Sequence, residues 1–138
     1  MKLDEWTERI PGEARFRRAH RLRSPLDFAR VRTGGRRVNG RYLSLGYVAS
    51  GPGAPVRIGF SVSKRVGGAV VRNRVKRRLR EAARQQVTSL APGWDIVIAA
   101  RPSAAQQPYA ALDAELRELF TRATLWCEQA EQVRQVLP

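Results

Sequence analysis

The chain has 138 residues, with 26 Lys or Arg against 12 Asp or Glu, and its formal net charge is +14. This length suits one compact domain with a modest core, and a single cysteine with a single histidine excludes an internal disulfide and a zinc site of the usual composition. No apolar run approaches the ~18 residues of a membrane span and the first residues lack the apolar core of a secretion signal, so we expect a cytoplasmic protein with no membrane partner.

The positive charge is concentrated in one part of the chain. Residues 14–84 hold 20 basic and 2 acidic residues, whereas residues 1–13 and 85–138 are each slightly acidic. Nearly all the cations are arginines, whose planar guanidinium matches phosphate and stacks on bases. Such clustering is typical of a protein that binds a polyanion, because each neutralised phosphate releases counterions. A solvated basic surface without a partner is the simpler alternative.

The first predicted element is a helix over 24–35, after a loosely ordered extension over 1–14. Ser24 is a good N-cap, Pro25 suits the first helical position, and Asp27 completes a capping-box-like pattern. A helix is therefore expected to begin at this point.

Three strands follow in the prediction. Alternating apolar residues predict strands over 38–50 and 56–63, and the turn residues between them, GPGAP, indicate a hairpin. The run WDIVIAA over 94–100 is almost continuously apolar, which indicates a central strand covered on both faces. Enough residues separate it from the second strand for a helical crossover, so these two strands are expected to pair in parallel.

Apolar stripes at helical spacing predict two further helices, over 69–88 and 109–126, and residues 127–138 are expected to form a tail or a helix extension. The predicted fold is a small single-domain α+β sandwich of two layers, formed by residues 15–126, with the order α-β-β-α-β-α.

The strongest functional signal lies in GFSVSKRVGGAVVRNRVKRRLRE, residues 59–81. On a helix, Asn73, Arg77, Arg80 and Arg84 share one face, opposite the apolar stripe. Like charges three or four residues apart repel by roughly 0.2–0.5 kcal/mol a pair, a cost that a bound polyanion would offset. The free N–H groups at the helix start also favour phosphate. A membrane-surface helix fits less well, because the apolar stripe is small and rich in valine.

This segment resembles the protein component of bacterial ribonuclease P, whose signature is an Arg-Asn-Arg run at the start of the basic helix, here residues 72–74. The strand before it, the early segment RLRSPLDFARVRTGG and the segment DIVIAARP also fit the family pattern, and the resemblance spans roughly residues 15–125. It implies a mixed sheet with a left-handed β-α-β crossover, against the usual right-handed rule.

The resemblance also implies a function: a protein subunit that binds the catalytic RNA and the 5′ leader of precursor tRNA and assists endonucleolytic removal of the leader. The basic helix would bind the catalytic RNA through Lys64, Arg65, Arg72, Asn73, Arg74, Lys76, Arg77 and Arg80. A cleft between the first helix and the exposed sheet face would bind the single-stranded leader. The matching positions are Phe28, Arg32, Tyr42 and Ser44.

Two positions in this cleft depart from the family pattern. Arg32 stands where family members often have a second aromatic residue, and Gly46 lies where an aromatic residue is expected on the first strand. We therefore expect the cleft to depend more on charge and less on stacking. Ordinary core packing explains Phe28 as well as RNA contact does.

No catalytic or metal site is expected in the chain itself. His20 and Cys127 lack partners in the sequence, Asp27 is explained by the helix cap, and Asp95 stands near a strand start. Metal-dependent hydrolysis by a protein needs several converging carboxylates. In the family the chemistry belongs to the RNA, so Mg²⁺ would be a cofactor of the holoenzyme, with one protein per RNA and no small-molecule substrate.

Two other kinds of function remain open. One is a structural RNA-binding module such as a small ribosomal protein, and the other is a nuclease in which the protein alone is active. A KH module is disfavoured because Gly67 and Gly68 are adjacent, and an RRM because its aromatic signature is absent.

Overall fold

The computed structural model of this chain describes residues 18–127. The predicted extension over 1–14, and residues 128–138 of the predicted tail, lie outside the described residues.

Four strands form one mixed sheet in the spatial order β1-β2-β4-β3. β4 pairs antiparallel with β2 and parallel with β3, which confirms the predicted parallel pairing. β1 pairs antiparallel with β2 and forms one edge of the sheet. The strands are β1 (Arg36–Asn39), β2 (Leu43–Ala49), β3 (Arg57–Ser61) and β4 (Trp94–Ala100).

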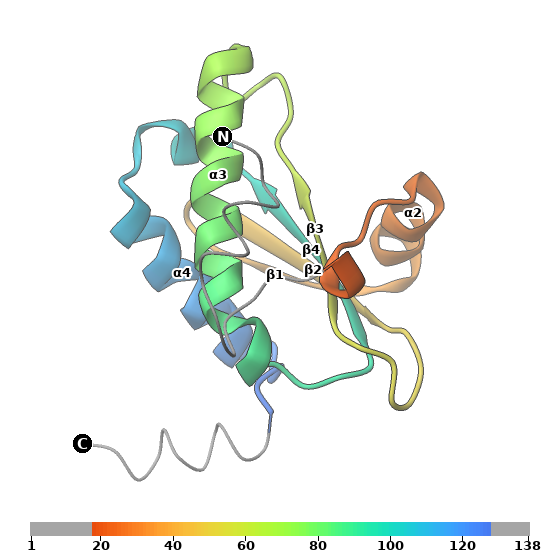
Figure 1. Cartoon of the computed structure of the whole chain (residues 1–138). Helices are drawn as coiled ribbons and strands as arrows, with labels where there is room; N and C mark the ends of the chain where they lie inside the picture. The colour runs from red at the N-terminus through yellow and green to blue at the C-terminus, as the bar shows by residue number, and fades with distance from the viewer. Residues whose placement is uncertain (1–17, 128–138) are drawn as a thin grey trace, which may run out of the picture.

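Helices lie on both sides of this sheet (Figure 1). α3 (Ala69–Gln86) and α4 (Tyr109–Arg122) cover one face together, and α2 (Pro25–Gly34) lies against the other. The α+β class and the mixed sheet are therefore confirmed, while the left-handed sense of the β3-α3-β4 crossover stays a prediction from the resemblance. Three short 3-10 helices complete the described part of the chain, at Arg18–His20, Val87–Ser89 and Pro102–Gln106.

The core lies between the sheet and the pair α3 and α4. Period-2 alternation directs Leu43 and Leu45 of β2 to this face, and the register places Leu45 opposite Ile98 of β4. Leu79 of α3 and Phe120 of α4 cover them, and all five side chains have no exposed surface. The apolar stripes of both helices therefore have the partner that their spacing predicted.

Two predictions about the strands were wrong. The predicted strand 38–50 is two strands, because the chain turns after Asn39 and returns as β2. The predicted hairpin between 38–50 and 56–63 is absent, because β4 lies between β2 and β3. The nearly continuous apolar sequence of β4 gains most burial at the centre of the sheet. The order is thus α-β-β-β-α-β-α.

The last helix is shorter than the predicted 109–126. α4 ends at Arg122, and Thr124 adopts a left-handed conformation with φ of 58° that turns the chain. The reversal buries Leu125 and Trp126 against the core and lets Cys127 N–H donate to the Ser89 carbonyl at 2.8 Å. Burial of two large side chains outweighs one more helical turn.

Candidate nucleic-acid interface

The basic side of α3 faces away from the core. Val75, Leu79, Ala82 and Ala83 are buried on one side of the helix, which fixes the direction of the opposite side. There Asn73, Arg74 and Arg77 are exposed and Arg72, Lys76 and Arg80 are half-buried; we call these six residues the basic face of α3.

Lys64 and Arg65 join this face from the turn that precedes α3. Both are exposed, and the turn is closed by hydrogen bonds from Val66 N–H to the Ser63 carbonyl (3.1 Å) and from Gly67 N–H to the Lys64 carbonyl (3.2 Å). The N-cap of α3 makes no side-chain hydrogen bond, and its first turn holds no acidic residue. The start of α3 therefore favours an external anion. All eight residues predicted to bind the catalytic RNA lie on α3 or directly before it.

Two arginines of α3 have structural roles. Arg78 donates from NH1 to the Gln107 carbonyl at 2.5 Å and so ties α3 to the segment before α4. Arg84, which helical spacing placed on the same face as Asn73, is buried and forms an ion pair with Glu81 at 2.5 Å. Sequence spacing alone could not show that Arg84 is paired within the fold.

The opposite side of the molecule carries the predicted leader cleft. α2 begins at the Ser24 cap, whose hydroxyl accepts from Leu26 N–H at 3.2 Å. The Phe28 ring lies against Gly59, and a Cβ on Gly46 would lie 3.2 Å from Val31 Cγ1. Glycines on β2 and β3 thus let α2 approach the sheet closely.

Beside α2, part of this sheet face carries small polar side chains. The register places Ser44 opposite Asn39 on one side and Ala99 on the other, and Ala99 opposite Ser61 of β3. Ser44 is half-buried and Ser61 is exposed. This row lies next to α2, whose Arg32 is exposed.

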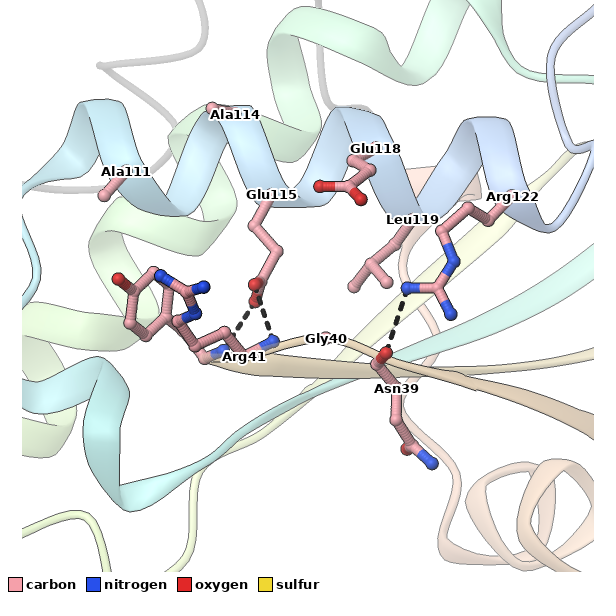
Figure 2. Close-up of a pocket in the computed structure, with 10 residues that line it drawn as sticks. Asn39, Gly40, Arg41, Ala111, Ala114, Glu115, Glu118, Leu119 and Arg122 are labelled. Atoms are coloured by element: carbon pink, nitrogen blue, oxygen red, sulfur yellow. Dashed lines mark hydrogen bonds between the residues drawn. The ribbon is translucent and has the colours of Figure 1, made fainter.

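Tyr42 does not lie on that face. It lines a pocket of about 580 Å³ between the β1–β2 turn and α4, together with Ala111 and Glu118. Figure 2 shows Glu115 pointing from α4 to this turn, where its carboxylate accepts from the backbone N–H groups of Arg41, Tyr42 and Leu43 at 2.7, 2.7 and 2.6 Å. The structure therefore brings Phe28, Arg32 and Ser44 together and places Tyr42 across the sheet.

The residues considered for protein catalysis have structural partners. His20 Nδ1 lies 2.8 Å from the Val56 carbonyl, and Asp27 and Asp95 both contact Arg57. The hydrogen bond with Asp95 raises the pKa of Arg57 above its usual value. Cys127 is half-buried and lies beyond the end of α4. Within residues 18–127, no three His, Cys, Asp or Glu side chains gather as metal ligands would.

Sequence reasoning did not identify Glu115 or the partners of Asp95. An acidic residue at the start of an apolar strand was one available signal, since a buried carboxylate requires a cation nearby. For Glu115 no signal existed, because its partners are backbone N–H groups more than seventy residues earlier.

Comparisons with known proteins agree with this fold and surface. A family model described as Ribonuclease P matches residues 16–124. Relatives named "Ribonuclease P protein component" include one from Roseiflexus castenholzii, 45% identical over 109 residues (78% of this chain, 88% of the relative). Another, from Symbiobacterium thermophilum, is 41% identical over 110 residues (80% of this chain, 96% of the relative).

Two solved structures share the fold. The RNase P protein of Staphylococcus aureus superposes with a TM-score of 0.73 at 27% identity, covering 80% of this chain and all of that one. The RNase P protein of Thermotoga maritima, solved with 1-(4-fluorophenyl)-2-thiourea, gives 0.68 at 26% identity, covering 74% of this chain and 98% of that one. None of the helices in residues 18–127 combines the length and apolar character needed to cross a bilayer.

Proposed function

This chain belongs to the ribonuclease P protein family, and from that membership we propose that it binds the catalytic RNA and the 5′ leader of precursor tRNA, and so assists endonucleolytic removal of the leader. The mature 5′ end of the tRNA is the product. The partners in this proposal are one ribonuclease P RNA per protein and the precursor tRNA, in the cytoplasm, with no membrane or small-molecule partner.

The observation that carries the proposal is the basic face of α3. Its five cations point away from the core, and the acidic residue of this helix, Glu81, is already paired with Arg84. Arginine forks bind phosphate oxygens in pairs, and neutralising phosphates releases counterions. The exposed Lys64 and Arg65 extend the same surface. We assign this surface to the catalytic RNA.

The leader belongs on the other side of the molecule, between α2 and the sheet. Arg32 supplies a cation there, Ser44 a hydroxyl, and the half-buried Phe28 a partly accessible ring edge. An extended single strand presents phosphates and unstacked bases, both of which such a surface can contact. Tyr42 would meet the leader only if the strand continued around the β1–β2 turn.

The bond-breaking chemistry is assigned to the RNA. Mg²⁺ bound to RNA would stabilise charge on the reacting phosphate and activate water. The described residues do not fit a magnesium site, since Asp27 and Asp95 are held by Arg57 and other basic partners. The protein would act by screening phosphate repulsion and by holding the leader.

The test is cleavage of precursor tRNA at low Mg²⁺ by a bacterial ribonuclease P RNA, with the protein, without it, and by the protein alone. We expect the protein to restore cleavage by the RNA and to be inert by itself. A protein that binds RNA and never increases cleavage would instead be a structural RNA-binding module. Cleavage by the protein alone would place the chemistry in the chain.

A further inference from the structure

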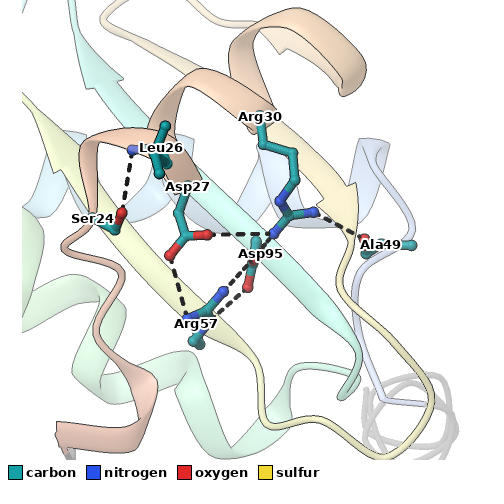
Figure 3. A network of polar contacts seen from close by, with 7 residues as sticks. All are labelled: Ser24, Leu26, Asp27, Arg30, Ala49, Arg57 and Asp95. Carbon is teal, nitrogen blue, oxygen red and sulfur yellow. Dashed lines mark hydrogen bonds and ion pairs between the residues drawn. The ribbon is translucent and has the colours of Figure 1, made fainter.

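Two carboxylates and two guanidinium groups form a closed cluster between α2 and the sheet (Figure 3). Asp27 and Arg30 come from α2, Arg57 from β3 and Asp95 from β4. Each carboxylate contacts both guanidinium groups. We call these four residues the α2 charge cluster; its formal charge is balanced.

Asp95 is the centre of the cluster. Its side chain is fully buried, with 0% exposed, and its oxygens accept from Arg57 Nε at 2.9 Å and NH2 at 2.7 Å. Arg30 NH2 donates to the same carboxylate, and Arg30 NH1 donates to the Ala49 carbonyl at 3.3 Å. Arg30 therefore ties α2 to β4 and to the end of β2.

Asp27 closes the cluster from the helix side. Its carboxylate lies 3.5 Å from Arg57 NH1 and 4.0 Å from Arg30 NH2. Charged groups that are held by two opposite charges lose little freedom and keep a fixed geometry. The cluster thus fixes α2 relative to two strands at once.

The apolar contacts of α2 do not supply that geometry. Val31 is the one buried side chain of this helix, and Leu26 is 81% exposed. Phe28 and Val31 rest on Gly59 and Gly46, which offer no Cβ ridge against which a ring or a methyl group could be held sideways. Hydrophobic burial is non-directional, whereas a two-point arginine–carboxylate pair is directional.

We infer that the α2 charge cluster is the device that positions α2 for recognition of leader-bearing tRNA, with Arg30 and Asp95 as positioning residues. The cluster sets how far Arg32 on α2 stands from Ser44 on β2, and hence the width of the surface between them. This inference rests on the proposed function, because it assigns the leader to that surface. It adds that recognition depends on residues that need not touch RNA.

The test compares Arg30→Gln with Arg117→Gln in the reconstituted holoenzyme. Both changes remove a guanidinium of similar exposure (41% and 50%) from an ion pair, but the Arg117 pair with Asp113 lies within α4. The measured quantities are the melting temperature, the Kd for the catalytic RNA, and the ratio of the Kd values for mature and precursor tRNA. That ratio is the leader preference.

Displacing a positioning group by about 1 Å can cost roughly 100-fold. We therefore expect Arg30→Gln to lower the leader preference at least about fivefold, with the Kd for the catalytic RNA unchanged. Arg117→Gln should leave both quantities at the wild-type values. Asp95→Asn, assayed below its own melting temperature, should lower the preference further, because both arginines lose their shared partner.

The inference is overturned if Arg30→Gln keeps the wild-type leader preference, or if Arg117→Gln loses as much at an equal loss of melting temperature. Failure of the proposed function looks different. In that case the wild-type holoenzyme itself would show no leader preference, or the wild-type protein would not bind the catalytic RNA.

Discussion

The ring of Phe28 on α2 lies against Gly59 on β3, at a place where a Cβ atom on residue 59 would overlap the ring. Gly59 is buried, although it belongs to the sheet face opposite the main core. The missing side chain is what lets the helix approach, so this contact connects the choice of one glycine to the shape of the leader surface.

Gly59→Ala is expected to lower the free energy of unfolding by about 1–3 kcal/mol, since the added methyl group forces Phe28 and α2 away from the sheet. The measurement is urea unfolding. Gly34→Ala at the end of α2 is the matched control, because no atom lies within 4 Å of its added Cβ. It should be neutral or slightly stabilising, as alanine favours helix over glycine. Wild-type stability for Gly59→Ala would refute the close approach.

Glu115 is expected to stabilise the fold without any role in RNA binding. Its carboxylate accepts from three successive backbone N–H groups of the β1–β2 turn, a concave arrangement that binds anions. Glu115→Ala should lower the free energy of unfolding by about 2–3 kcal/mol, because charge-assisted hydrogen bonds are lost and backbone donors are left unpaired. Urea unfolding measures this loss.

The control for that change is Glu118→Ala on the same helix. Glu118 lines the same pocket as Glu115, and the hydrogen bonds to the turn belong to Glu115. Its substitution should alter stability by no more than about 0.5 kcal/mol. Equal losses for the two variants would show that the hydrogen bonds to the turn contribute nothing specific.

The sequence predicted those parts of the fold that follow from local pattern. α2 and α3 follow from the Ser24 cap and from apolar spacing, and the central position of β4 follows from its continuous apolar run. The pairing of β2 and β3 was wrong, because strand order depends on which neighbour buries most surface, and a turn sequence such as GPGAP fixes only a change of direction. The end of α4 depended on Trp126 finding the core.

The candidate site divides in the same way. The basic face of α3 could be read from helical spacing, because the cations and the apolar stripe lie on one continuous helix. Arg84 could not be distinguished from Arg80, since its ion pair with Glu81 and its burial depend on the folded protein. Tyr42 was grouped with Ser44 by alternation, yet the β1–β2 turn begins between Asn39 and Leu43 and interrupts the period.

Phe28 and Tyr42 should now behave differently in leader recognition. Phe28→Leu is expected to reduce the preference for precursor over mature tRNA, because the leader surface loses its aromatic edge; stacking on an aromatic ring is worth about 1–3 kcal/mol per base. Tyr42→Leu should leave the preference unchanged for a short leader, since Tyr42 lies across the sheet. Equilibrium binding of both tRNA species measures the preference.

The companion readout is unfolding stability, since Phe28 also packs on Gly59. A variant that binds precursor and mature tRNA more weakly by the same factor has lost structure and not recognition. An equal loss of preference in both variants would instead place the leader around the β1–β2 turn.

Arg72→Ala combined with Arg74→Ala is expected to weaken binding of the catalytic RNA and to flatten its salt dependence. Each phosphate contact contributes a slope of about 0.7–0.9 in log Kd against log salt concentration, so the double variant should lose roughly 1–2 units of slope. Arg117→Ala with Arg122→Ala removes the same charge from α4 and is the matched control. It should change the slope much less, because long-range attraction is screened beyond about 10 Å. Equal slopes for the wild type and the α3 variant would show that the basic face of α3 does not contact phosphate.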